Sequence, residues 1–200
     1  MEHEEIVKKI DEQAIKIDAI YKSVDAGKNW TKVENGLPSG EGIGRMGLAI
    51  SDNNPEVMYV LVDNRTQDES GNVVGGELFR SNNSGETWVK MEKGLPKEMG
   101  KMAITVSRAN SEKVYALIES DFTKEAGGMY VSENAGKTWS HATSDHRIIG
   151  RAWYYIEVFA DPVEENTVYV LGAAGLKSAD GGKAWTNLSG THGDYHQLWI

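Results

Sequence analysis

Short runs of β-branched and aromatic residues, separated by turn residues about every ten positions, cover the chain from residue 19 onward. Runs of this length predict β-strands rather than helices. They recur in one order: a strand such as Met46–Ser51 precedes one such as Val57–Leu61, and Gly76–Ser81 follows. Similar triplets begin near residues 102 and 154. The pattern therefore predicts an all-β protein built from repeated units.

A segment of the form S-x-[DN]-x-G-[KE]-x-W closes each unit and occurs at residues 23–30, 81–88, 132–139 and 178–185. The four tryptophans are 58, 51 and 46 residues apart, which is typical of stacked units such as propeller blades. We predict a hairpin tip in which Asp or Asn accepts from a backbone N–H two residues on, and in which Gly has a positive φ. The Trp should begin the next strand and be buried. The residues given these structural roles are Asp25, Gly27, Trp30, Asn83, Gly85, Trp88, Asn134, Gly136, Trp139, Asp180, Gly182 and Trp185.

Four antiparallel strands per unit, repeated around an axis, describe a β-propeller blade. In propeller order, with the innermost strand first, complete units span residues 44–92, 100–142 and 151–188. Only outer strands of a first unit precede them, at residues 15–34, and residues 195–200 read as the innermost strand of a fifth. That last strand either closes a four-bladed ring with the first, or the chain is part of a larger propeller, which we favour. Unpaired blade edges would then pair with further blades or with another copy.

Residues 1–18 differ from the rest of the chain, since Ile6, Ile10, Ala14 and Ile17 lie at helical spacing among charged residues. We predict a short amphipathic N-terminal helix outside the propeller region of residues 19–200. The helix would cover a sheet edge or, in a second interpretation, dock a partner.

Composition and charge exclude several classes of protein. The net charge of −9 argues against a nucleic-acid surface, which needs clustered Lys and Arg. No apolar run is long enough to span a membrane, and the acidic start of the chain does not resemble a signal peptide. The chain has no Cys, so disulfides and thiolate metal sites are excluded, and we predict no cofactor.

The four repeated segments resemble the Asp-box, or bacterial neuraminidase repeat, of sialidases, sortilin-type propellers and xyloglucanase-like propellers. Gly44–Ile50, Arg151–Tyr155 and His192–Ile200 are further similar to large bacterial sortilin-like proteins, often described as glycosyl hydrolases. The likeness covers residues 19–200 and does not extend to residues 1–18. It implies a many-bladed propeller and an extracellular or periplasmic location. The segments are specific for the repeat class and not for an activity.

Propellers bind ligands where the loops that enter the innermost strands converge, and here those loops carry the cations Arg45, Lys101 and Arg151. An anionic glycan or an acidic peptide is a plausible ligand, because guanidinium groups pair with carboxylates. The alternative is that these are solvated cations or partners of nearby acidic groups. The aromatic residues after Arg151 either stack on sugar rings or belong to the core; they are Trp153, Tyr154 and Tyr155.

The turn at residues 192–196 is the best local cluster of polar groups, because alternate residues of an extended segment face one way. His192, Asp194 and His196 could bind a ligand directly, act as an acid–base set or, as a weaker hypothesis, hold a metal. A hydrogen-bonded structural turn is the interpretation that we favour over these.

Two classes of function follow from these residues, beside a purely structural module. The first is a non-catalytic, sortilin-like binding or scaffold propeller that recognises a glycan or peptide at the channel mouth. The second is part of a sialidase-like or xyloglucanase-like glycoside hydrolase that acts on polysaccharide. Hydrolysis needs two carboxyl groups that flank the scissile bond, and no spacing in this sequence singles out such a pair. The sequence therefore leaves open whether the protein is an enzyme.

Overall fold

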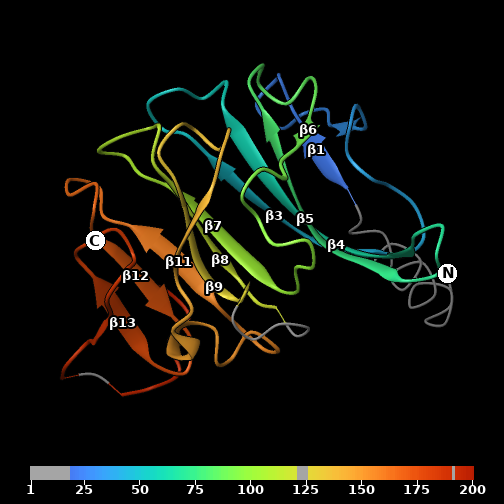
Figure 1. Ribbon diagram of the computed structural model, residues 1–200. Helices are drawn as coiled ribbons and strands as arrows, with labels where there is room; N and C mark the ends of the chain where they lie inside the picture. The colour runs from blue at the N-terminus through green and yellow to red at the C-terminus, as the bar shows by residue number, and fades with distance from the viewer. Residues whose placement is uncertain (1–18, 121–125, 191) are drawn as a thin grey trace, which may run out of the picture.

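The structure is a computed structural model that describes residues 19–120, 126–190 and 192–200 (Figure 1). β-Strands make up most of the regular structure, and a short 3₁₀ helix, η2 (His146–Ile148), precedes the last sheet. The helix predicted for residues 1–18 lies outside the described residues. The prediction of an all-β protein is confirmed.

Three four-stranded antiparallel sheets follow one another along the chain, and each is a propeller blade. They consist of β3 (Ile43–Ile50), β4 (Met58–Gln67), β5 (Val73–Ser81) and β6 (Val89–Lys90); β7 (Met102–Val106), β8 (Val114–Ile118), β9 (Gly128–Ser132) and β10 (Ser140–Thr143); and β11 (Glu157–Ala160), β12 (Val168–Leu171), β13 (Gly175–Ser178) and β14 (Thr186–Asn187). The sheets correspond to the predicted units at residues 44–92, 100–142 and 151–188, but the innermost strand of the last one begins at Glu157 rather than near residue 154. We call these sheets the second, third and fourth blades.

The first blade contains the hairpin of β1 (Ile20–Lys22) and β2 (Thr31–Val33), which pair only with each other among the described residues. The prediction that residues 195–200 form an innermost strand is wrong, because the described residues offer this segment no hydrogen-bonded strand partner. Figure 1 shows β1 and β13 at opposite ends of a row of sheets. No ladder therefore closes the described residues into a four-bladed ring.

The innermost strands β3, β7 and β11 lie side by side, β3 against β7 and β7 against β11. Apolar side chains fill the spaces between neighbouring blades rather than the middle of one domain. Val60 and Phe79 face the first blade, Leu61 and Ile104 lie between the second and third, and Val131 lies between the third and fourth. Each blade is thus stabilised by the burial of apolar surface against its neighbours.

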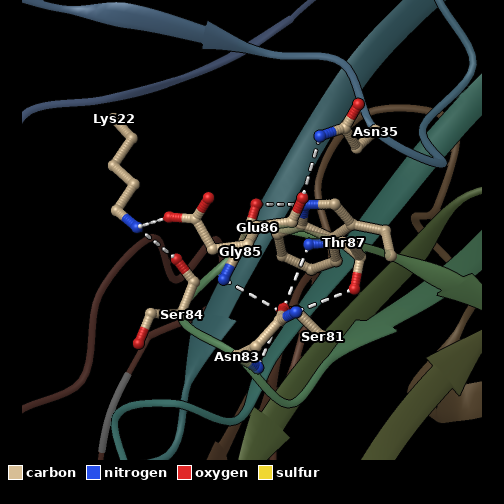
Figure 2. Close-up of polar contacts among 9 residues, drawn as sticks. Lys22, Asn35, Ser81, Asn83, Ser84, Gly85, Glu86 and Thr87 are labelled. Carbon is tan, nitrogen blue, oxygen red and sulfur yellow. Dashed lines mark hydrogen bonds and ion pairs between the residues drawn. The ribbon is translucent and has the colours of Figure 1, made fainter.

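Each Asp-box forms the tip of the hairpin between the two outer strands of its blade, as predicted. In the second copy the Ser81 hydroxyl donates to Asn83 Oδ1 at 2.9 Å and accepts from the Gly85 backbone N–H, also at 2.9 Å (Figure 2). The other three copies repeat both contacts. The predicted positive φ of the box glycine is confirmed at 81° to 86°.

The predicted contact of the Asp or Asn side chain is corrected by the structure. The carboxylate or amide oxygen accepts from the N–H four residues on, as Asn83 does from Thr87 at 3.0 Å, and not from the N–H two residues on. The reason is that the box serine takes the nearer N–H groups. The residue before the glycine is also left-handed, for example Ser84 at φ 57°. The buried serines, which the sequence analysis did not single out, are therefore central to the turn.

The predicted burial of the box tryptophans holds for three of the four copies. Trp88, Trp139 and Trp185 are 5–6% exposed, each in the core between its own blade and the preceding one. Trp30 is 61% exposed, so the prediction is wrong for the first copy. The physical reason is that each box packs against the preceding blade, and the described residues place no blade before the first.

Candidate functional site

A cavity of about 250 Å³ lies where the starts of β3 and β7 meet the segment that enters β11. Arg45, Lys101, Tyr154 and Tyr155, all predicted ligand-binding residues, line it together. They come from three successive blades, and only the propeller arrangement brings them to one place. This cavity lies where the sequence analysis expected the channel mouth, and we refer to it as the mouth.

The two cations of the mouth follow glycines that allow a close approach between strands. A Cβ on Gly44 would lie 2.9 Å from Asp63 Oδ2, so this position leaves room for a carboxylate beside Arg45. Lys101 Nζ lies 3.7 Å from the same Asp63 oxygen, which also accepts from Arg65 at 2.8 Å. Arg45 is exposed and has no ion-pair partner within the described part of the chain. Arg45 is therefore the cation most available to a ligand.

The aromatic residues at 153–155 lie in turns before β11, not in the strand that the sequence pattern predicted. The strand begins at Glu157, because residues 151–155 instead make the backbone bonds of a turn, with Arg151 accepting from Tyr154 and Tyr155 at 2.9 Å. Trp153 is 73% exposed and Tyr154 is 52% exposed, so these rings form an open surface beside the mouth and not a core.

Arg151 is the predicted cation that the structure places differently. Its Nη1 atom donates to Asp194 Oδ1 at 2.5 Å, and its guanidinium lies 5.3 Å from the centre of the Tyr154 ring. Arg151 is thus already paired, which agrees with the alternative of a cation bonded to a nearby acidic group.

The turn at residues 192–196 is attached to this aromatic surface. The Tyr155 hydroxyl donates to the His196 carbonyl at 2.7 Å, and the two rings are 4.7 Å apart. Asp194 has φ 70°, and its Oδ1 atom lies 3.5 Å from His196 Nε2. His192 does not join the other two: its ring stacks on Tyr195 and lies against the Gly193 carbonyl. The contacts are those of a hydrogen-bonded structural turn.

A metal site at this turn finds no support in the geometry. Within residues 19–120, 126–190 and 192–200, no three His, Asp or Glu side chains are grouped so that they could hold one ion. Asp194 is bonded to a guanidinium instead, and His192 is turned toward another ring.

Two carboxylates that the sequence analysis did not select, Asp63 and Glu157, also line the mouth. Burial raises the pKa of the Glu157 carboxyl above its ordinary value. The pKa of the neighbouring Tyr155 is raised by burial first and then by the charge of Glu157. Asp63 could not be selected from the sequence, because its partner Lys101 belongs to another blade.

A second cavity of about 400 Å³ lies at the opposite ends of the same inner strands. Its lining includes Leu48, Ile50, Trp199 and Ile200, which are all exposed apolar residues. Arg108 at this end is paired with Asp52 across two blades. Glu157 lines this cavity as well as the mouth, and the one cation among the described lining residues is Arg108.

The comparison with protein families decides the membership of this chain. The profile of the Sortilin-Vps10 family, described as sortilin, neurotensin receptor 3, matches residues 18–140. The chain belongs to the Sortilin-Vps10 family. The comparison with curated proteins found no match. The predicted resemblance to sortilin-like propellers is confirmed for this member of the family.

Solved structures of other proteins have a fold similar to that of this Sortilin-Vps10 chain. The GH74 xyloglucanase from Xanthomonas campestris aligns with 88% of the chain at 18% identity and a TM-score of 0.63. The GH74 enzyme of Niastella koreensis aligns with 87% at 18% identity and a TM-score of 0.56. A Hadza microbial sialidase aligns with 86% at 16% identity and a TM-score of 0.53. The chain covers 28%, 27% and 41% of these proteins, respectively, so it spans less than half of each.

Identities this low show a shared fold and no shared activity. The Sortilin-Vps10 chain thus shares its propeller fold with GH74 enzymes and with a sialidase. Among residues 19–120, 126–190 and 192–200, the structure contains no helix with the length and apolar character needed to cross a membrane.

Proposed function

We propose that this propeller segment is a binding module that holds one acidic group of a glycan or peptide at the channel mouth. The observation that supports this most strongly is that Arg45 and Lys101 share one cavity with the rings of Tyr154 and Tyr155. A guanidinium pairs with a carboxylate, and an aromatic face packs on the C–H surface of a sugar or an apolar side chain. Although the chain has a net charge of −9, Arg45 at this cavity has no acidic partner among the described residues and can attract an anion locally.

Arg45 is the main anchor in this proposal, because it is exposed and has no ion-pair partner within the described residues. Lys101 contributes less, since Asp63 lies 3.7 Å from its ammonium group. Tyr154 supplies the stacking surface, and the Arg151 guanidinium lies 5.3 Å from the centre of its ring. Asp63 and Glu157 repel a second negative charge, so we expect ligands with one acidic group at the mouth rather than a dense polyanion.

The test is a titration with two acidic probes, an oligomer of galacturonic acid and a short peptide that ends in Asp, and with an uncharged galactose oligomer as a reference. A hydrogen bond to a charged group contributes about 1.5–3 kcal/mol. We therefore expect Arg45→Ala to weaken binding of the acidic probe about 10-fold to 150-fold. Arg108→Ala is the matched control, because Arg108 lies at the opposite end of the inner strands and lines the other cavity.

Two results would refute the proposal. One is that neither acidic probe binds the parent chain more tightly than the uncharged oligomer. The other is that Arg108→Ala weakens binding as much as Arg45→Ala, which would place the effect in the net charge of the protein and not in the mouth.

A second candidate function is part of a glycoside hydrolase, and the pair of carboxylates at the mouth favours it. Glu157 has a pKa raised by burial, as a general acid requires, and Asp63 lines the same cavity. Xyloglucan and sialyllactose are the substrates to test, because the structural neighbours include a xyloglucanase and a sialidase. Release of sugar that Glu157→Gln abolishes, with binding retained, would support this function over pure binding.

Membership of the Sortilin-Vps10 family also supports an extracellular or periplasmic location, which we propose for the protein. Fractionation of cells that express the full natural gene would test it, and recovery in the cytoplasmic fraction alone would contradict it.

A further inference from the structure

A cavity of about 470 Å³ lies between the second blade and the third Asp-box, and we call it the rim cavity. Its lining comes from β5, from β6 and the segment after it, and from the third box. Among the described residues it shares no lining residue with the mouth. Four of the lining residues are cations, and they are Arg80, Lys90, Lys93 and Lys137.

The charge of the rim cavity is opposite to that of the whole protein. The chain has 30 Asp and Glu against 21 Lys and Arg, whereas Glu92 is the one acidic residue among the described lining residues. A cluster of cations in a concave site raises the local concentration of anions. The rim cavity therefore favours an anion over a cation.

The contact between the first and second blades shows how a cation beside a box is neutralised. Lys22 is the residue before the first box. Its Nζ atom donates to the Ser84 carbonyl and to Glu86 Oε1, both at 2.8 Å (Figure 2). Glu86 is the sixth residue of the second box, so an ion pair of opposite charges joins these two blades.

The contact between the second and third blades has two cations at the same two positions. Arg80 precedes the second box as Lys22 precedes the first, and Lys137 is the sixth residue of the third box as Glu86 is of the second. Both cations line the rim cavity, and neither has an acidic partner among the described residues. At the next contact Val131 precedes the box, so this pair of like charges belongs to the rim cavity alone among the three contacts. Like charges at one contact repel each other, and an anion between them would remove that repulsion.

The Arg80 guanidinium also has a donor that the protein leaves unused. Its Nε atom is buried without a hydrogen-bond partner among the described residues, and so is the hydroxyl of Tyr59, which lies opposite Arg80 in the ladder of β4 and β5. Burial raises the pKa of Tyr59 and the neighbouring Arg80 opposes this rise, so the two groups lie close together. Buried polar groups normally have partners, so two unpartnered groups at one place indicate a missing acceptor.

The other cations of the rim cavity differ in how far they are already paired. Lys90 Nζ lies 2.9 Å from Glu77 Oε1 and 3.4 Å from Glu92 Oε1, so Lys90 is engaged and the one lining carboxylate is paired. The Lys93 carbonyl accepts from the Trp139 N–H at 2.9 Å, which holds this residue beside the third box while its side chain is exposed. Three cations are thus left for a ligand, namely Arg80, Lys93 and Lys137.

We propose that the rim cavity binds a tetrahedral oxyanion, a phosphate or sulfate group that is free or is an ester on a sugar. One guanidinium and two ammonium groups from separate segments suit a group with three or four acceptor oxygens better than a carboxylate with two. At about 470 Å³ the cavity is far larger than one water, which takes about 30 Å³, so a sugar ester has room as well as a free ion. The anion takes the role that the Glu86 carboxylate has in the first contact, and it joins the second blade to the third box.

The first test is calorimetric titration of the full chain with sodium phosphate, sodium sulfate and glucose 6-phosphate, with glucose as the uncharged reference. Sodium chloride keeps the ionic strength at about 0.15 M, where long-range charge effects are screened. The charged probes should bind and glucose should not. Arg80→Gln should weaken binding about 10-fold to 150-fold, the range expected for a hydrogen bond to a charged group. Tighter binding of glucose 6-phosphate than of free phosphate identifies an ester as the source of the group, and equal binding identifies the free ion.

The second test uses Lys137→Glu, which restores the charges of the first contact and changes an exposed side chain. A carboxylate beside Arg80 should abolish binding of phosphate and sulfate. It should also raise the urea midpoint in buffer without these anions, because attraction replaces repulsion. Lys183→Glu is the matched control: Lys183 is the exposed sixth residue of the fourth box, and the blade before it has Val131 in place of Arg80. Its affinity for the probes should equal that of the parent.

Three results would overturn the proposal. The first is that none of the charged probes binds the parent chain, and the second is that Lys183→Glu weakens binding as much as Lys137→Glu. The third is that Arg45→Ala weakens phosphate binding as much as Arg80→Gln, which would place the anion at the mouth. Because the two cavities share no lining residue among those described, carboxylate binding at the mouth can hold or fail separately.

Discussion

The four Asp-boxes allow the contribution of tryptophan burial to be measured inside one protein. Trp30 and Trp88 occupy the same position in the same turn, and each indole N–H donates to the glycine carbonyl of its own box, at 3.0 and 3.1 Å. They differ in exposure, 61% against 5%. Comparing Trp30→Ala with Trp88→Ala therefore cancels the hydrogen bond and isolates the burial against the neighbouring blade.

The expected difference follows from the buried area. A fully buried Trp removes about 150–250 Å² from water. At about 25 cal/mol per Å² this is worth about 4–6 kcal/mol. Burial of Trp88 contributes nearly all of this free energy. Trp30 is covered over only about two fifths of its surface, so its burial contributes about 1.5–2.5 kcal/mol. We expect Trp88→Ala to lower the free energy of unfolding by about 2–4 kcal/mol more than Trp30→Ala.

The assay is urea unfolding followed by far-ultraviolet circular dichroism, at a protein concentration where light scattering gives a single copy. Trp88→Phe serves as a milder variant if Trp88→Ala does not fold. Equal losses for Trp30→Ala and Trp88→Ala, at unchanged dependence on urea, would refute the view that the boxes stabilise the fold by covering the preceding blade.

Three further predictions concern backbone conformation and pH. Gly94→Ala should lower the urea midpoint far more than Gly71→Ala: both have φ above 80°, but only the Cβ at Gly94 meets another group, the Trp139 carbonyl, among the described residues. The strain at Gly71 alone should cost about 1 kcal/mol. Backbone N–H groups of its own box lower the pKa of Asp180, so its stabilisation is present above about pH 4 and is lost as the pH falls through the folded pKa. The urea midpoint of Asp180→Asn should therefore change less than that of the parent between about pH 6 and pH 3, and an equal change would contradict this. Burial raises the pKa of Glu157, so ionisation destabilises the fold as the pH rises through that pKa. Glu157→Gln should accordingly be more stable than the parent at about pH 7, with the difference shrinking toward about pH 4, and a variant less stable than the parent at neutral pH would refute this.

Local chemistry explains why the blades could be predicted from the sequence. The box glycine is needed because its φ lies at 81° to 86°, and the strands around it carry the β-branched and aromatic residues that pleated, half-buried surfaces select. The hydrogen bonds inside the turn could not be predicted in the same way. Serine and Asp or Asn can both accept from nearby N–H groups, and the sequence does not say which one takes which.

The candidate site was predictable only in part. Arg45 and Lys101 could be placed because each precedes its strand tyrosine by the same number of residues. The segment at residues 151–155 was assigned to a strand because aromatic residues favour strands, but its backbone bonds to itself in turns. The pairing of Arg151 with Asp194 joins residues 43 positions apart, and no local pattern reports such a contact.

The sequence by itself determined the repeated unit, its four strands and the turn that closes it, because these depend on residues close together in the chain. The tertiary structure alone decided which tryptophan is exposed, which cation is already paired and which carboxylates reach the mouth. Burial and ion pairing depend on the neighbouring blade, and identical boxes acquire different surroundings according to their place in the row. Trp30 shows this most directly, since the same eight-residue pattern buries three tryptophans and leaves this one in solvent.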